Sequence, residues 1–163
     1  MRYTFLLLFV FNWLSARSQI SGNSLNAILG KTYKQVNEIS QLKNYKVFES
    51  VLIEESLNEK LGFSELSDGK NNIVLLTKHI APRSNKILAV LEIGNMPKSS
   101  RLIMARCRLN GKNDGYIVAV ASMSAKKYLK HIIKAWRWDV KSLMFKQMPP
   151  TGIDCINQDD YDD

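Results

Sequence analysis

Two histidines are the side chains of this chain best suited to acid–base chemistry near neutral pH. His79 and His131, with Glu92 as a carboxylate and the many lysines as cations, supply the groups that phosphodiester cleavage requires. Their spacing does not bring them together in sequence. A nuclease with His131 or His79 as general base is therefore an alternative hypothesis, and it depends on the fold placing them in one cleft.

Cys107 and Cys155 are the only cysteines, and they allow two interpretations. One is a nucleophilic thiol beside a histidine, but no signature of a catalytic cysteine surrounds either residue. The other is a disulfide, which would close a loop of about 49 residues and stabilise the fold by about 4 kcal/mol in the chain-entropy model. We expect the disulfide.

The first 18 residues have the order of a secretory signal peptide. Arg2 supplies a positive start, residues 5–14 form an apolar run, and Ala16 and Ser18 are the small residues of a cleavage site before Gln19. The run is shorter than the roughly 20 residues of a membrane-spanning helix, although an uncleaved anchor is the alternative. The residue directly after the cleavage point is not a cysteine, so we expect no lipoprotein. The mature chain, 19–163, is predicted to be periplasmic or secreted, without a transmembrane segment, which favours the disulfide.

The composition predicts one globular domain. The chain has 163 residues, 45% of them hydrophobic and 23% charged. It has no P-loop, no dinucleotide fingerprint and no H-E-x-x-H motif, and its cysteines and histidines lack the spacing of a zinc site. We expect no metal and no cofactor. The identity of the ligand and the oligomeric state stay open.

The net charge of +8 is distributed very unevenly. Residues 19–77 carry a net −1, residues 78–148 carry +12, and residues 149–163 carry −5. In the basic segment cations alternate with aromatic residues, and the candidate binding residues are Arg106, Arg108, Lys130, Lys134, Trp136, Arg137 and Trp138. Such a surface suits an anionic envelope component or an acidic protein. Nucleic acid is a weaker candidate because no RNP-like motif is present, and a solvated strand face without function is the remaining alternative.

Hydrophobic periodicity divides the mature chain into a helical and a strand-rich part. It predicts an amphipathic helix over 24–42, then either a helix or a short strand at 46–53. Strands are predicted at 73–80, 87–93, 101–109 and 116–123, and the last two form a hairpin with Leu109 opposite Tyr116. A short helical turn near 125–130 is expected to precede a second hairpin at 131–148, with Phe145 opposite Trp136. A helix is the alternative for this segment, because apolar residues also follow a helical stripe over 124–141.

These elements predict a single α+β domain over 19–150. N-terminal helical segments pack on a mainly antiparallel, meandering sheet of five or six strands. The acidic tail, 151–163, is tied to the domain by Cys155. We consider that this tail could fold back and mask the basic segment.

The end of the chain carries a resemblance to a known group of proteins. Residues 134–137 (KAWR), Phe145 and residues 152–157 (GIDCIN) resemble a pattern found in small exported proteins of Bacteroidota, and the resemblance covers the last third of the chain. It implies a periplasmic or secreted α+β domain and carries over no active site.

Two hypotheses of function follow. The first is a non-enzymatic exported binding domain of the cell envelope that turns a basic sheet face toward an anionic partner. The second is a small exported hydrolase, the nuclease considered above.

Overall fold

The computed structural model describes residues 25–53 and 58–157. The predicted leader and residues 158–163 of the acidic tail lie outside these residues. Three short 3-10 turns occur in the described part: η1 (Asn26–Ile28), η2 (Val36–Glu38) and η3 (Ser40–Leu42). The remaining elements are strands: β1 (Thr32–Tyr33), β2 (Lys46–Leu52), β3 (Leu61–Ser67), β4 (Asn72–Ala81), β5 (Ser84–Gly94), β6 (Ser100–Met104), β7 (Cys107–Leu109), β8 (Lys112–Asp114), β9 (Ile117–Ser122), β10 (Tyr128–Leu129), β11 (Ile132–Asp139), β12 (Met144–Met148) and β13 (Ile153–Ile156).

The predicted α+β fold is wrong, because the described chain is almost entirely antiparallel sheet. The segment expected to form a helix over 24–42 instead contains the three 3-10 turns and β1. Gly30 has a left-handed backbone with φ +76°, and Gln35 is extended, so no α-helix can continue through either position. Most of the large apolar residues of the segment are nevertheless buried, namely Leu25, Ile28, Tyr33, Ile39 and Leu42, whereas Leu29 is 46% exposed. Their three- and four-residue spacing therefore reflects packing of the segment against sheet A, and it does not indicate a helix.

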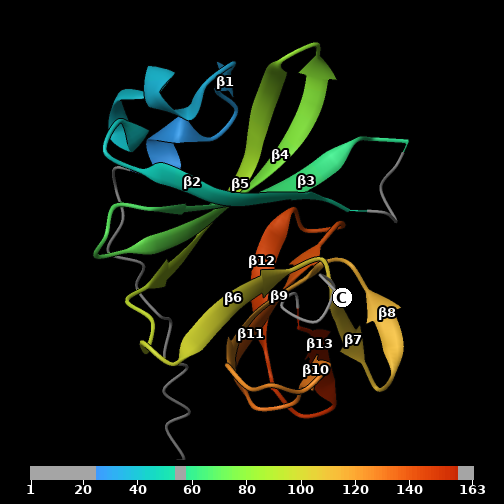
Figure 1. Cartoon of the computed structure of the whole chain (residues 1–163). Coiled ribbons are helices and arrows are strands. Elements are labelled where there is room, and N and C mark those ends of the chain that lie inside the picture. The colour runs from blue at the N-terminus through green and yellow to red at the C-terminus, as the bar shows by residue number, and fades with distance from the viewer. Residues whose placement is uncertain (1–24, 54–57, 158–163) are drawn as a thin grey trace, which may run out of the picture.

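Sheet A is a five-stranded sheet with the order β1-β5-β4-β3-β2. Strands β2 to β5 follow one another as an antiparallel meander, and β1 pairs with the far side of β5. The strands predicted at 73–80 and 87–93 are confirmed as β4 and β5, and the strand alternative for 46–53 is confirmed as β2. Figure 1 shows the N-terminal turns lying against this sheet.

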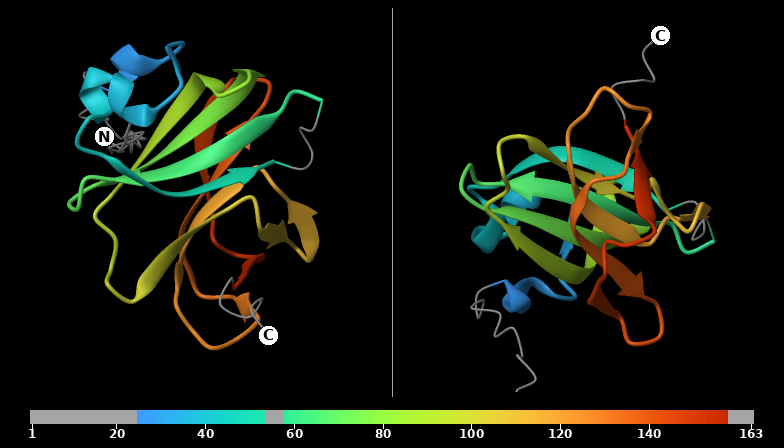
Figure 2. Two further views of the ribbon diagram at one scale, coloured as in Figure 1. Left: turned by 45° about the horizontal axis from the view of Figure 1, so that its top comes forward. Right: turned by 90° about the horizontal axis from the view of Figure 1, so that it is seen from below.

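Two four-stranded sheets make up the rest of the fold. Sheet B has the order β12-β11-β9-β6, and sheet C has the order β10-β13-β7-β8. Figures 1 and 2 show sheet A in one half of the molecule and sheets B and C in the other. Each interface between layers has its own apolar core: one between the N-terminal segment and sheet A, one between sheets A and B, and one between sheets B and C.

The first predicted hairpin has the wrong register. Strands β6 and β9 do pair, but Met104 faces Val118, whereas the prediction placed Cys107 opposite Val118. Ala105 adopts a left-handed backbone with φ 56°, which ends β6 and lets the chain leave sheet B. Strand β7 then enters sheet C and pairs with β8 and β13. One predicted strand over 101–109 is therefore two strands in different sheets.

The second predicted hairpin is confirmed, with its register shifted by two residues. Strands β11 and β12 pair so that Phe145 faces Trp138 instead of Trp136, and the two rings meet edge to face with centroids 5.4 Å apart. The helical turn expected near 125–130 is wrong, because residues 128–129 form β10 against β13.

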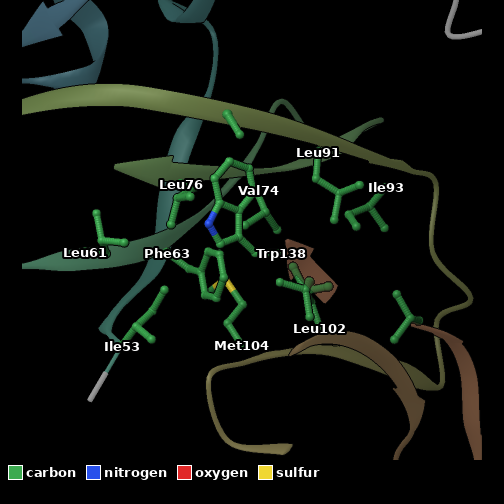
Figure 3. Close-up of a cluster of buried hydrophobic side chains, with 13 residues drawn as sticks. Ile53, Leu61, Phe63, Val74, Leu76, Leu91, Ile93, Leu102, Met104 and Trp138 are labelled. Carbon is green, nitrogen blue, oxygen red and sulfur yellow. The ribbon is translucent and has the colours of Figure 1, made fainter. Parts of the chain in front are cut away.

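The core between sheets A and B is centred on Trp138. Its side chain is 1% exposed and packs with Phe63, which is fully buried on β3. Figure 3 shows the indole among Phe63, Val74 and Leu76 of sheet A, with Leu102 and Met104 of sheet B nearby. The contact joins the two largest sheets, so their relative position depends on it.

We expect Trp138→Ala to lower the free energy of unfolding by about 3–5 kcal/mol, because it leaves a cavity between two sheets. Chemical denaturation measures the change. Met144→Ala on the same hairpin is the control: its side chain is 62% exposed, so a change below about 0.5 kcal/mol is expected. Equal losses in the two variants would contradict this position of the core.

Candidate functional site

The predicted basic face is largely neutralised by ion pairs within the chain. Arg108 donates two hydrogen bonds to the Asp154 carboxylate, at 2.7 and 2.9 Å. Arg137 donates one to Asp114 at 2.7 Å. The pairing with Asp154 raises the pKa of the Arg108 guanidinium, so the charge of this arginine is committed to its partner.

Arg106 also has a carboxylate partner, since its Nη1 atom lies 3.8 Å from Glu49 Oε1 on β2. This ion pair joins the connection between β6 and β7 to sheet A. Trp138, another predicted binding residue, is buried in the core and is not available to a ligand. Trp138 therefore does not belong to the exposed binding surface on which it was predicted.

Lys134 and Trp136 lie elsewhere on the molecule. They occur on the face of β11 that turns toward sheet A, and they line a hollow of about 480 Å³ between β5 and the β11–β12 hairpin. Arg137 lies on the opposite face of β11, because successive side chains alternate. The seven predicted residues thus do not form one continuous binding face.

A cluster of exposed lysines remains at residues 124–131, which we call the lysine loop. Lys126, Lys127 and Lys130 are exposed, and among the described residues none of them has an ion pair. Tyr128 lies in the same loop, with the Arg108 guanidinium 3.7 Å from its ring centroid and Lys127 Nζ 5.9 Å from it. Of the predicted residues, the structure brings Arg108 and Lys130 together here.

The C-terminal strand holds the lysine loop in place. The buried Asn157 donates its backbone N–H to the Lys127 carbonyl and its side-chain amide to the Ser124 carbonyl, both at 2.9 Å. Strand β13 pairs with β10 on one side and with β7 on the other. The lysines therefore project from a backbone whose polar groups are satisfied, as in a preorganised site.

The predicted disulfide is confirmed and supports this arrangement. Cys107 on β7 and Cys155 on β13 are bonded, and they are directly opposite each other in sheet C. Because Leu129 on β10 pairs with Cys155, the covalent link lies one strand away from the lysine loop. The alternative of a free nucleophilic thiol is excluded for both cysteines.

The candidate catalytic residues are not brought together. His79 is on β4 of sheet A, with Nδ1 3.4 Å from Asn85 Oδ1. Glu92 on β5 is opposite Ile73, six residues along β4 from His79, which is about 20 Å. His131 precedes β11 of sheet B.

His131 makes one contact that is typical of a nucleophile and its base, because its Nδ1 atom lies 2.6 Å from Ser122 Oγ. The contact is exposed, and among the described residues no carboxylate is hydrogen-bonded to the ring. The geometry therefore gives no acid–base pair and no oriented triad.

Sequence reasoning missed a carboxylate pair on the inner face of sheet A. Glu49 and Glu65 are directly opposite each other on β2 and β3, beside a hollow that Arg101 also lines. Burial of Glu65, together with the nearby Glu49 charge, raises its pKa to about 7 against the opposing effect of Arg101. No local signal could have found the pair, because the like charges meet only through the β2–β3 register.

Two further properties concern the described residues as a whole. In 25–53 and 58–157, no three side chains of His, Cys, Asp or Glu gather in a way that could hold a metal ion. The same residues contain no helix of the length and apolarity that crossing a bilayer requires.

Because the folded pKa of Glu65 lies above its ordinary value of 4.5, the folded state binds more protons than the unfolded state between these values. The free energy of unfolding should therefore fall as pH rises from about 4.5 to 7, on the order of 1 kcal/mol after solvent screening. Denaturant titrations at several pH values measure this fall. Glu65→Gln should remove it, whereas an identical pH profile in the variant would exclude Glu65 as its source.

The chain matches no family model, no curated protein and no solved structure in the comparisons with known proteins.

Proposed function

We propose that the protein is an exported, non-enzymatic binding domain that uses the lysine loop against an anionic component of the cell envelope. The observation that carries this proposal is the contrast between the two kinds of cation. Arg106, Arg108 and Arg137 are paired with carboxylates, whereas the loop lysines are exposed and without ion pairs among the described residues. Of these cations, the loop lysines can exchange their counterions for an anionic surface without first breaking a salt bridge.

The aromatic residues favour an envelope component over nucleic acid. Binding of single-stranded nucleic acid commonly requires accessible aromatic faces on which bases stack. The Tyr128 ring is already covered by Arg108 at 3.7 Å, and Trp138 is buried. In the lysine loop, the groups available to a ligand are the flexible, charged lysine side chains. Such charges suit a dense anionic surface such as phospholipid headgroups.

Export supports the same proposal. The predicted leader and the resemblance to exported proteins of Bacteroidota both predict export from the cytosol. The Cys107–Cys155 disulfide is compatible with an oxidising compartment. The nuclease alternative loses its support, because His79 lies on β4 of sheet A whereas His131 lies between β10 and β11.

Binding to phosphatidylglycerol vesicles tests the proposal. We expect binding that weakens as salt is added, and at least a tenfold loss of affinity in the triple variant Lys126→Ala, Lys127→Ala, Lys130→Ala, since each lysine near such a surface contributes about 1 kcal/mol. Vesicle co-sedimentation at several salt concentrations measures this.

The matched control is the triple variant Lys43→Ala, Lys70→Ala, Lys86→Ala. It removes the same charge from exposed lysines in the other half of the molecule, and its affinity should stay within about threefold. Equal losses in the two triple variants, or equal binding of the native protein to phosphatidylcholine vesicles, would contradict a role for the lysine loop.

A further inference from the structure

Strand β2 is an edge strand with an unusually apolar exposed surface. It is the last strand of sheet A, so its outer side has no strand partner among the described residues. Val47, Phe48 and Leu52 are 48%, 69% and 62% exposed. Natural proteins usually protect a long edge strand with charges, proline, bulges or short length. Strand β2 has seven residues and no proline, and its protection is confined to Lys46, Glu49 and the bulge between Val47 and Glu49, so residues 50–52 form an unprotected stretch.

The hydrogen-bond pattern shows which backbone groups of β2 point outward. Ile53 donates its N–H to the carbonyl of Leu61, the residue directly opposite. Because hydrogen-bonded and non-hydrogen-bonded pairs alternate in an antiparallel ladder, Ser50 and Leu52 are in non-hydrogen-bonded pairs with β3. The 2.8 Å contact between Ser50 Oγ and Ser64 Oγ fits this, since side chains are closer in such pairs. The N–H and C=O groups of Ser50 and Leu52 therefore point away from the sheet.

Hollows lie on both faces of this edge. On the outer face a hollow of about 540 Å³ is lined by Tyr33, Ser50, Leu52, Ser64, Thr77 and His79. On the inner face another, of about 470 Å³, is lined by Phe48, Glu49, Glu65, Met96, Arg101 and Met123. A strand added beside β2 sends successive side chains to opposite faces, so it would place side chains at the β2 border of both hollows.

We propose that the outer edge of β2 binds an extended segment of a partner protein as an additional antiparallel strand. The two hollows set the chemistry of the segment. The outer hollow, floored by Gly62 and bordered by hydroxyl groups, takes a small or β-branched side chain. The inner hollow takes a lysine, because its methylene chain can pack along Phe48, Met96 and Met123 while its ammonium lies near Glu65. Glu49 already pairs with Arg106.

This site is separate from the proposed function. The β2 edge belongs to sheet A, and the lysine loop adjoins sheet C. The two proposals can therefore fail independently, and the triple lysine-loop variant should bind the peptide below as the native protein does.

The test uses the acetylated and amidated peptide TVKVTVT, which presents valines to one face and a lysine to the other. NMR titration of the full mature chain should give saturable amide shifts along β2. Hydrogen exchange at the Ser50 and Leu52 amides should be fast in the free protein and slow at least tenfold with peptide. No slowing at 1 mM peptide would overturn the proposal. Slowing that increases with protein concentration, without peptide, would overturn it in favour of a second copy of this chain.

Two substitutions of Ser50 distinguish the contribution of its backbone N–H to peptide binding from that of its side-chain hydroxyl. Ser50→Pro removes the outward N–H, and it should weaken peptide binding at least tenfold, since an edge strand tolerates proline where the N–H faces solvent. Ser50→Ala keeps the N–H and should bind within about threefold of the native protein. Equal binding by both variants would overturn strand addition. If Ser50→Pro fails to fold, the exchange measurement on the native protein decides the question.

Discussion

The lysine loop depends on one constraint, the covalent and hydrogen-bonded attachment of β13 to β7. Cys107 and Cys155 face each other across these two strands and are joined by the disulfide. Beyond β13, Asn157 bonds to the loop carbonyls of Ser124 and Lys127. These bonds, together with the pairing of β10 and β13, hold the loop against sheet C. A bond between residues far apart in sequence thus sets the position of the exposed loop lysines.

The rest of the fold supplies a rigid base for sheet C. Strand β9 is buried along most of its length, with Val118 and Val120 facing the core shared with sheet A and Ala119 and Ala121 facing the core shared with sheet C. The two cores therefore share a strand, and through it the position of sheet C depends on the packing of sheet A around Trp138. The proposed binding loop belongs to sheet C, whereas the β2 edge belongs to sheet A.

Much of the strand content could be predicted from local sequence, whereas the N-terminal segment could not. β-branched runs such as residues 73–80 identified β4, and turn residues identified the hairpin of β11 and β12. Residues 25–42 have helical spacing, but they are interrupted by the left-handed Gly30 and are buried by a sheet formed later in the chain. The predicted register of the 101–109 strand was wrong because the chain turns at Ala105. The positive φ of Ala105 could not be predicted, since alanine has no preference for the left-handed region.

The candidate site was only partly accessible from sequence because its electrostatics are non-local. The charge count located the basic segment correctly, yet it could not show which cations are neutralised. The carboxylate partner of Arg108 is 46 residues away, and that of Arg106 lies on β2 in another sheet. Glu49 and Glu65 likewise meet only through strand pairing.

The most direct test of the central claim is hydrogen exchange of the Asn157 amide in the native protein and in the double variant Cys107→Ala, Cys155→Ala. If the disulfide-linked β13 holds the lysine loop, exchange at Asn157 should accelerate at least tenfold more than exchange at the central amides of β4. Acceleration of equal size at both places, or none at Asn157, would contradict the account.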